Sequence, residues 1–188
     1  MDKAEILRYL RTSSKIEDEN VLNLVESCMN EINGIVTPKT IYRVFECEVT
    51  DSEVIVCGTV FRSKRLAETL KGCKKVCIMG ATLGVQGDRL LNLYAETEIA
   101  RAAVMQAALA SKIEEVCDGV EDTLRAQGFN LRQRYSPGYF DLDISQQREL
   151  FSLIDITKSI GVTLTDTFQM IPTKSVTAII GIDDDGHN

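Results

Sequence analysis

The residues best suited to chemistry in this sequence stand together at positions 134–139, which read RYSPGY. Proline fixes its own φ and favours an extended residue before it, and Pro-Gly is typical of a type II turn because glycine tolerates a positive φ. Side chains alternate in an extended lead-in, so Arg134 and Ser136 should share one face, and Tyr139 leaves the turn nearby. A guanidinium, a hydroxyl, the bare backbone of Gly138 and an aromatic ring would converge there. This combination suits a zwitterionic or nucleoside-like ligand.

The same stretch also fits a simpler interpretation, a turn whose tyrosines pack and whose arginine is solvated. Two further groups of polar residues are open to both structural and functional interpretations. Glu114 and Glu115 are neighbours, so on a helix they point about 100° apart and do not form a paired-carboxylate site, although one could reach a ligand amine. Thr173-Lys174-Ser175 offers a cation and two hydroxyls at the start of the last predicted strand. Nothing resembles an activated nucleophile, so we predict no catalytic residue.

A glycine-rich stretch at 80–87 follows a predicted strand and precedes a predicted helix. Its spacing, Gly-x3-Gly-x2-Gly, matches neither the dinucleotide fingerprint nor the P-loop. A tight connection is therefore favoured over a phosphate cradle.

The composition narrows the function classes. The 188 residues carry a net charge of −7 and no basic stripe, so the electrostatic signature of nucleic-acid or anionic-membrane binding is missing. The sequence has neither a secretory signal nor an apolar run approaching the ~18 residues of a spanning helix, which predicts a cytoplasmic protein. Its six cysteines are expected to be free thiols, and Cys73 and Cys77 have no nearby histidine, so no metal site is predicted.

The elements that must position these residues follow from periodicity. Helices are expected over 2–12, 18–32 and 64–71, with a hairpin of strands over 41–49 and 54–61, in which Gly58 marks a bulge. A strand over 75–79 precedes the 80–87 connection, and Asp88 is expected to cap a short helix. The longest helix should run from about 97 to 127, and its many alanines indicate close backbone approach, as in a central helix laid against a sheet.

The remaining elements are an extended lead-in at 130–133, a helix over 146–160 and strands at 162–165 and 176–182. Helices and strands mix without regular alternation, which predicts an α+β fold with a mainly antiparallel sheet. We expect a single domain over 1–188, with a helical N-terminal region of about 1–36 and a frayed tail of about 183–188.

Two motifs carry a family resemblance. Arg-x-x-Pro-Gly-Tyr at 134–139 and the stretch GVTLTDTFQMIP at 161–172, followed by a Ser-Val strand, resemble the activation domain of cobalamin-dependent methionine synthase. Ala108-Leu109-Ala110 leading to Glu115 resembles the helix before the first motif. The whole chain is most similar to short, free-standing versions of that domain, including the segments at 8–10 and 81–84.

The resemblance implies a bent antiparallel sheet flanked by helices, and a role in rescuing oxidised cobalamin. In the family, one electron from a flavodoxin-type donor and a methyl group from S-adenosylmethionine restore methylcobalamin. The residues implied to bind S-adenosylmethionine are Arg134, Ser136, Gly138, Tyr139 and Glu115. Those implied as additional pocket residues are Tyr135, Pro137, Lys174 and Ser175.

The sequence departs from the family pattern at several positions. The acidic residue expected six positions before the motif arginine is Gly128 here, and the family's early aspartate and later tyrosine segment have no counterpart. The first hypothesis is an accessory reactivation domain that presents S-adenosylmethionine to cobalamin carried by a methionine synthase or another corrinoid protein. The alternative is a binding module that docks on a corrinoid protein or its electron donor without S-adenosylmethionine. A nucleotide-binding enzyme using 80–87 is a third, weaker hypothesis.

Overall fold

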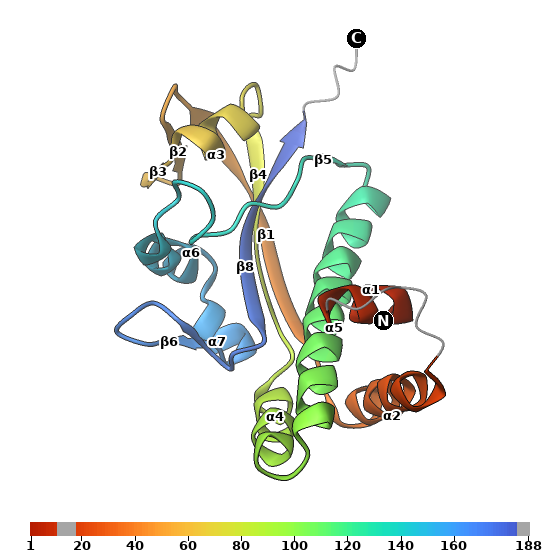
Figure 1. Cartoon of the computed structure of the whole chain (residues 1–188). Coiled ribbons are helices and arrows are strands. Elements are labelled where there is room, and N and C mark those ends of the chain that lie inside the picture. Colours follow the sequence, from red (N-terminus) through yellow and green to blue (C-terminus); the bar gives the residue numbers. More distant parts are fainter. Residues whose placement is uncertain (11–17, 184–188) are drawn as a thin grey trace.

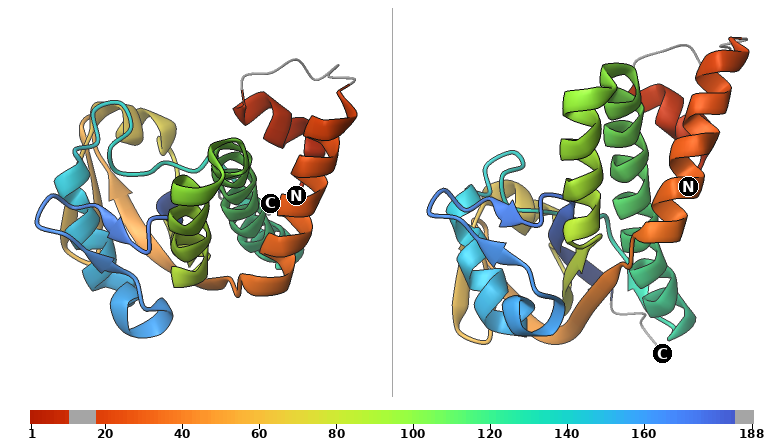
Figure 2. Two further views of the ribbon diagram at one scale, coloured as in Figure 1. Left: turned by 60° about the horizontal axis from the view of Figure 1, so that its bottom comes forward. Right: turned by 90° about the horizontal axis from the view of Figure 1, so that it is seen from below.

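A six-stranded antiparallel sheet is the centre of the fold in the computed structural model, which describes residues 1–10 and 18–183 (Figure 1). The strand order is β3-β2-β1-β4-β8-β5. The strands are β1 (Lys39–Val49), β2 (Glu53–Val56), β3 (Thr59–Arg62), β4 (Lys75–Thr82), β5 (Asn130–Leu131) and β8 (Ser175–Asp183), with a separate pair of β6 (Thr163–Leu164) and β7 (Met170–Ile171). β1 pairs with β4 over 39–46 and with β2 over 47–49, and the sheet bends where the partner changes (Figure 2). This confirms the predicted bent antiparallel sheet.

Helices cover both faces of the sheet (Figures 1 and 2). On one face lie α1 (Lys3–Tyr9), α2 (Glu19–Ile35), α4 (Val85–Thr97) and α5 (Ile99–Ala126). On the other lie α3 (Lys64–Thr69), α6 (Gln147–Ile154) and α7 (Ile156–Ile160), with a 3-10 turn (Ile144–Gln146) before α6. None of the helices in the described ranges is long and apolar enough to cross a membrane.

Alternation along the central strand explains the two cores. Cys77 and Met79 of β4 point toward α5, whereas Val76 and Ile78 point toward α6 and α7. The buried alanines of α5, such as Ala108, allow this long helix to lie close to the sheet. The alanine stripe therefore predicted the central position of α5 correctly.

The prediction of one strand over 54–61 is wrong. Cys57 and Gly58 both have positive φ, 50° and 78°, and they form the two-residue loop between β2 and β3. Two positive φ values are what a type I′ hairpin turn requires. Gly58 therefore makes a hairpin turn and not a bulge.

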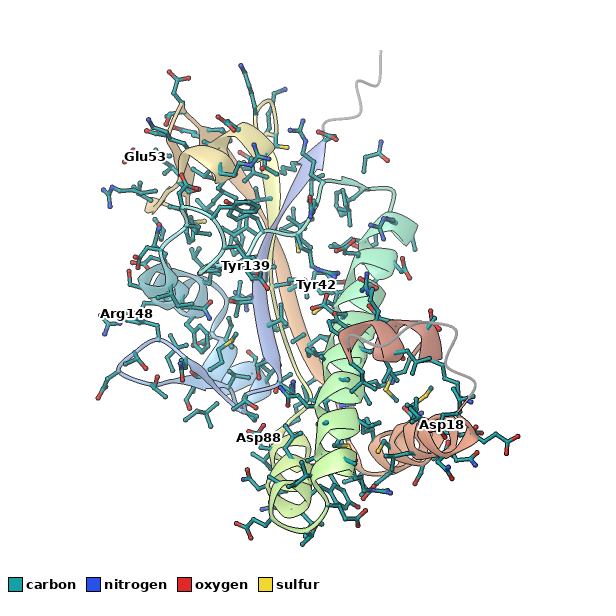
Figure 3. All side chains as sticks on the ribbon, in the orientation of Figure 1. Asp18, Tyr42, Glu53, Asp88, Tyr139 and Arg148 are labelled. Atoms are coloured by element: carbon teal, nitrogen blue, oxygen red, sulfur yellow. The ribbon has the colours of Figure 1, made fainter. Side chains whose placement is uncertain are left out.

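The prediction that Asp88 caps a helix is also wrong. α4 begins earlier, at Val85, with Gly84 as its N-cap at φ 76°. Asp88 lies in the first turn of this helix (Figure 3), and its carboxylate accepts from the main chain and hydroxyl of Thr173. A Cβ added at Gly80 would lie 3.4 Å from Ile156, which agrees with a tightly packed connection. α1 ends at Tyr9, and the rest of the helix expected over 2–12 falls partly outside the described residues, as does the tail after Asp183.

Candidate functional site

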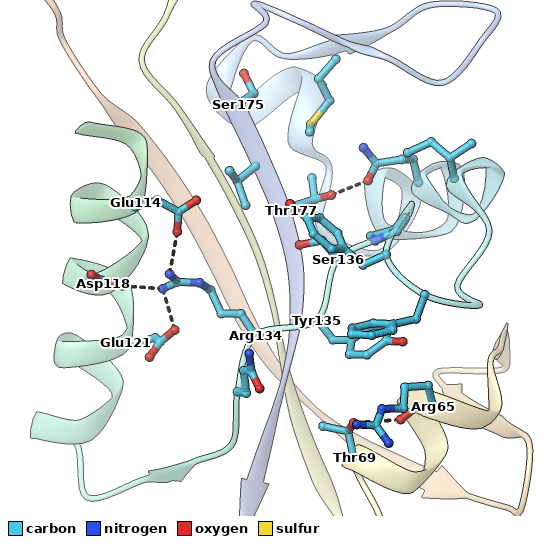
Figure 4. A pocket seen from close by; sticks show the side chains of 18 residues that line it. Arg65, Thr69, Glu114, Asp118, Glu121, Arg134, Tyr135, Ser136, Ser175 and Thr177 are labelled. Atoms are coloured by element: carbon cyan, nitrogen blue, oxygen red, sulfur yellow. Dashed lines mark hydrogen bonds and ion pairs between the residues drawn. The ribbon is translucent and has the colours of Figure 1, made fainter. Parts of the chain in front are cut away.

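A cavity of about 610 Å³ opens at the edge of the sheet, between α5 on one side and the segment after β5 on the other (Figure 4). Ligand pockets are typically ~300–1,000 Å³, so the cavity has room for a drug-sized molecule. It is lined by Arg65, Thr69, Glu114, Asp118, Glu121, Gln133, Arg134, Tyr135, Ser136, Pro137, Tyr139, Phe140, Ile144, Gln147, Met170, Ser175, Val176 and Thr177. The segment predicted to carry the site therefore borders the cavity almost throughout.

The Pro-Gly turn has the predicted form. The N–H of Tyr139 donates to the carbonyl of Ser136 at 3.3 Å, and Gly138 has a φ of 89°. A positive φ at the third position is the type II requirement. A Cβ at Gly138 would also lie 3.1 Å from Ile144 Cδ1, so glycine is needed here for both conformation and space.

Arg134 is held by three carboxylates of α5. Its Nη1 donates to Asp118 at 2.8 Å and to Glu121 at 2.6 Å, and its Nη2 donates to Glu114 at 2.9 Å (Figure 4). Burial lowers the pKa of Arg134, but the hydrogen bond to Asp118 and the charge of Glu121 outweigh it, and the net shift is upward. A guanidinium has five N–H donors, so the Nε–H and one Nη2 N–H remain for a ligand.

Sequence reasoning missed the acidic wall formed by Glu114, Asp118 and Glu121. Their spacing of four and three residues places them on one face of a helix, and this spacing is visible in the sequence. The sequence favoured Glu115 instead, which the structure does not bring to the cavity. Glu115 pairs with the N-terminal amine of Met1 and with Lys112 at 2.8 Å. The charge of the acidic wall exceeds that of Arg134, so this side of the cavity carries a net charge of −2.

The aromatic residues at 135–140 divide into a buried residue, Tyr135, and two exposed ones, Tyr139 and Phe140. Tyr135 is buried, and its ring stacks on Phe140 with centroids 5.9 Å apart. Tyr139 is 66% exposed and Phe140 81% exposed, so both stand at the mouth of the cavity. Arg134 and Tyr135 point in opposite directions, toward α5 and toward α3 respectively (Figure 4).

Lys174 and Ser175, at the start of β8, also lie in different surroundings. Ser175 lines the cavity, and its hydroxyl lies 2.8 Å from Thr82 Oγ1 and donates to the carbonyl of Pro172 at 2.7 Å. Lys174 lies outside the cavity lining, where its Nζ donates to the carbonyl of Gln106 at 3.4 Å. Burial lowers the pKa of Lys174. The structure therefore brings only Ser175 of the pair to the site.

Asp141 fastens the turn to the start of α3. Its carboxylate accepts from the Ser63 hydroxyl at 2.5 Å and from the main-chain N–H of Lys64 at 2.8 Å. Arg65 stacks over the ring of Phe140 at 5.7 Å, which adds a second link between α3 and the turn. The hydrogen bond from Ser63 holds the pKa of Asp141 below its ordinary value of 3.8. Asp141 is thus a positioning residue for the cavity mouth.

Asp141→Asn is expected to lower the melting temperature at pH 7 by about 2–4 °C, because Oδ1 and Oδ2 accept from Ser63 and Lys64, the amide keeps only one acceptor oxygen, and one lost hydrogen bond costs roughly 1 kcal/mol. A lowered folded-state pKa stabilises the fold above the ordinary value of 3.8, and this contribution is lost as the pH falls through the lower, folded value. Thermal unfolding at pH 7 and pH 3 should show the difference from wild type shrinking at acid pH. Asp166→Asn, in the loop between β6 and β7, is the control. A decrease in melting temperature that is equal at both pH values would contradict this role of the Asp141 carboxylate.

The cysteines are free thiols in the structure, as predicted, although Cys57 is exposed. Burial raises the pKa of Cys47 to about 11 and of Cys77 and Cys117 to about 12, so these thiols stay protonated at neutral pH. Within residues 1–10 and 18–183, no group of three His, Cys, Asp or Glu side chains is arranged to hold a metal ion.

Comparison with solved structures places the fold in a class. The chain superposes over 96% of its length on 70% of a structure described as the MetH reactivation domain bound to AdoHcy, with a TM-score of 0.71 and 14% sequence identity. At that identity the likeness defines the fold, which is that of a methionine synthase reactivation domain. None of the curated proteins compared with the chain matches it. Residues 87–187, more than half of the chain, match the family described as vitamin B12 dependent methionine synthase, activation domain. The chain belongs to this activation-domain family.

Proposed function

We propose that this chain is an accessory domain for the reductive reactivation of a cobalamin-dependent methionine synthase, and that it presents S-adenosylmethionine from the cavity beside Arg134. The family membership and the placement of the Arg-x-x-Pro-Gly-Tyr motif on the cavity wall support the proposal. The solved relative is described as bound to AdoHcy, the demethylated form of the same ligand. S-adenosylmethionine supplies a methyl group on a sulfonium, and a partner's cobalamin accepts it after one-electron reduction by a flavodoxin-type donor.

The two chemical halves of the cavity fit the two ends of this ligand. On the α5 side, the two remaining N–H donors of Arg134 suit a carboxylate, while the acidic wall of Glu114, Asp118 and Glu121 suits an ammonium and a sulfonium. On the other side, Ile144, Met170 and the exposed ring of Tyr139 provide the apolar surface that a nucleoside needs. This two-part arrangement is the single observation that most supports the proposal.

The acidic wall can replace the acidic residue that the family has at the position of Gly128. Gly128 has a φ of 91° just after α5 and helps to end that helix, so it offers no side chain to a ligand. Glu121, which lies between one and two helical turns before the end of α5, places a carboxylate beside Arg134. We infer that α5 supplies the negative charge expected at position 128.

A reactivation assay tests the proposed function. The chain is mixed with a methionine synthase that lacks its own activation domain, a flavodoxin-type reductant and methyl-labelled S-adenosylmethionine. Formation of labelled methylcobalamin only when the chain is present is the expected result. Arg134→Ala should abolish this formation, whereas Arg132→Ala, the same change two residues away at the ion pair with Asp183, is the matched control. Equal labelling with and without the chain would contradict the proposal.

The exposed aromatic residues favour a second candidate, a docking module without its own small ligand. Tyr139 and Phe140 present apolar surface at the cavity mouth, where a corrinoid protein or its electron donor could seat. In this case the chain should bind the corrinoid protein equally with and without S-adenosylmethionine. If S-adenosylmethionine strengthens the complex, the first candidate is favoured. A cytoplasmic location is part of both candidates.

A further inference from the structure

Cys47 and Cys73 lie side by side at the bend of the sheet. Cys47 follows the last residue of β1 in the ladder with β4 and begins the ladder with β2. Its N–H still donates to the carbonyl of Lys74 at 2.9 Å, which holds the turn before β4 against it. Its Sγ lies 3.7 Å from the main-chain oxygen of Cys73. The two cysteines are therefore neighbours in space, although 26 positions separate them in the sequence.

Both side chains pack into the same core, on the face of the sheet that α6 and α7 cover. Cys73 is 5% exposed, and Cys47 is partly buried. Residues that face each other in antiparallel strands have Cα atoms ~4.5–5.5 Å apart, and Cys47 faces Lys74, the neighbour of Cys73. A disulfide spans ~4.4–6.8 Å between Cα atoms, so the position of the pair suits one.

The charged groups around Cys73 suit its thiol to act as a nucleophile. The thiol donates to Oδ1 of Asp183 at 3.9 Å, and Nε of Arg132 donates to the same oxygen at 2.7 Å. A Cβ placed at Gly181 would lie 3.0 Å from Cys73 Sγ and 3.3 Å from Arg132 Cδ, so sulfur and arginine are close together. Asp183 can accept the thiol proton, and the guanidinium stabilises a negative sulfur. The side chains of Arg132 and Asp183 are 30% and 44% exposed, so this sulfur lies just beneath the surface.

We propose that Cys47 and Cys73 form a reversible disulfide when the chain is exposed to a peroxide. The thiolate of Cys73 attacks one oxygen of hydrogen peroxide and becomes a sulfenic acid, and the hydroxide released takes the proton held by Asp183. The thiol of Cys47 then attacks that sulfur, and its proton leaves with the hydroxyl group as water. Two thiols and one peroxide thus give one disulfide and two waters, and the two electrons lost by the sulfurs reduce the peroxide. Burial raises the pKa of the Cys47 thiol to about 11, which assigns the first attack to Cys73.

The bond would act on the architecture and not on the cavity. It would close a loop that contains β2, β3 and α3, and it would fix the junction at which β1 changes partners. Neither cysteine lines the cavity beside Arg134, so the inference does not depend on the proposed function. The competing partner is Cys57, which is exposed in the loop after Val56, the residue that pairs with Cys47.

Peptide mapping of the wild-type chain after treatment with hydrogen peroxide tests the proposal. Cleavage after lysine, arginine and glutamate puts Cys47, Cys57 and Cys73 on separate peptides. We expect a pair of peptides joined through Cys47 and Cys73 in a monomeric chain, and dithiothreitol should release both thiols by exchange. A bond that involves Cys57 instead, or oxidation of Cys57 with Cys47 and Cys73 still reduced, would overturn the assignment.

Thiol titration of variants, after unfolding in guanidinium, gives an independent measurement. Cys57→Ser is the matched control, because it removes the exposed thiol and leaves the pair. In this variant peroxide should remove two titratable thiols, and dithiothreitol should restore them. Adding Cys47→Ser or Cys73→Ser should prevent the disulfide, and melting curves under reducing conditions check that each variant folds. A disulfide in either double variant, or none in Cys57→Ser, would contradict the proposal, and the wild-type map decides if a double variant fails to fold.

Discussion

Replacing Arg134 by alanine is expected to abolish detectable binding of S-adenosylmethionine while leaving the chain folded. The variant removes the two N–H donors that remain for the ligand carboxylate, and each charge-assisted hydrogen bond contributes about 1.5–3 kcal/mol. Two such bonds correspond to an affinity loss of at least about a hundredfold. Isothermal calorimetry of wild type and variant measures this loss directly.

The fold should tolerate the change because it leaves none of the three carboxylates both buried and unpaired. Glu121 also accepts from Arg125 at 2.5 Å, and the side chains of Glu114 and Asp118 are 40% and 62% exposed. The exposed pairs with Glu114 and Asp118 contribute about 1 kcal/mol or less each, and Glu121, which is only 12% exposed, stays paired with Arg125, so melting curves should shift only slightly. Arg134→Lys separates charge from shape, since an ammonium keeps the charge but not the planar fork. Wild-type affinity in the lysine variant would contradict the role assigned to the guanidinium.

Charge selection is the second large effect that we expect. The ligand S-adenosylmethionine carries one more positive charge than S-adenosylhomocysteine, and the side of the cavity toward α5 has a net charge of −2. We therefore expect the methylated ligand to bind about tenfold more tightly at low salt, the equivalent of ~1.4 kcal/mol, with the preference shrinking as salt screens it. This order of affinities would favour release of the product after methyl transfer.

Neutral variants of the acidic wall test the origin of that preference. The double variant Glu114→Gln, Asp118→Asn should bind the two ligands with nearly equal affinity. Asp122→Asn is the matched control, because Asp122 is 76% exposed on the same helix, lies outside the cavity and pairs with Arg125. A preference that survives in the double variant, or that salt does not change, would show that the acidic wall does not select the ligand by charge.

Local patterns were enough to predict the frame of the fold and the turn of the site. The alanine-rich helix α5, the strand over 41–49 and the Pro-Gly turn at 137–138 each depend on residues close in sequence, and each prediction was correct. The β2–β3 hairpin was missed because Cys57 takes a positive φ, which is unusual for a residue with a Cβ. Sequence periodicity does not reveal such a conformation.

The partners within the site depend on contacts between distant segments. Arg134 meets Glu114, 20 residues earlier, and Asp141 meets Ser63, 78 residues earlier, so neither contact follows from local spacing. Which of Glu114 and Glu115 borders the cavity does not follow from local spacing either, because the rotation of α5 about its axis is fixed by packing against the sheet and α1.

The central claim is that the cavity beside the Pro-Gly turn binds S-adenosylmethionine through Arg134. Calorimetric titration of the whole chain with S-adenosylmethionine, alone and with the corrinoid partner, tests it most directly. The account predicts saturable binding at one site that Arg134→Ala removes and Arg132→Ala retains. Absence of binding by the wild-type chain under both conditions, or binding that Arg134→Ala leaves unchanged, would contradict it.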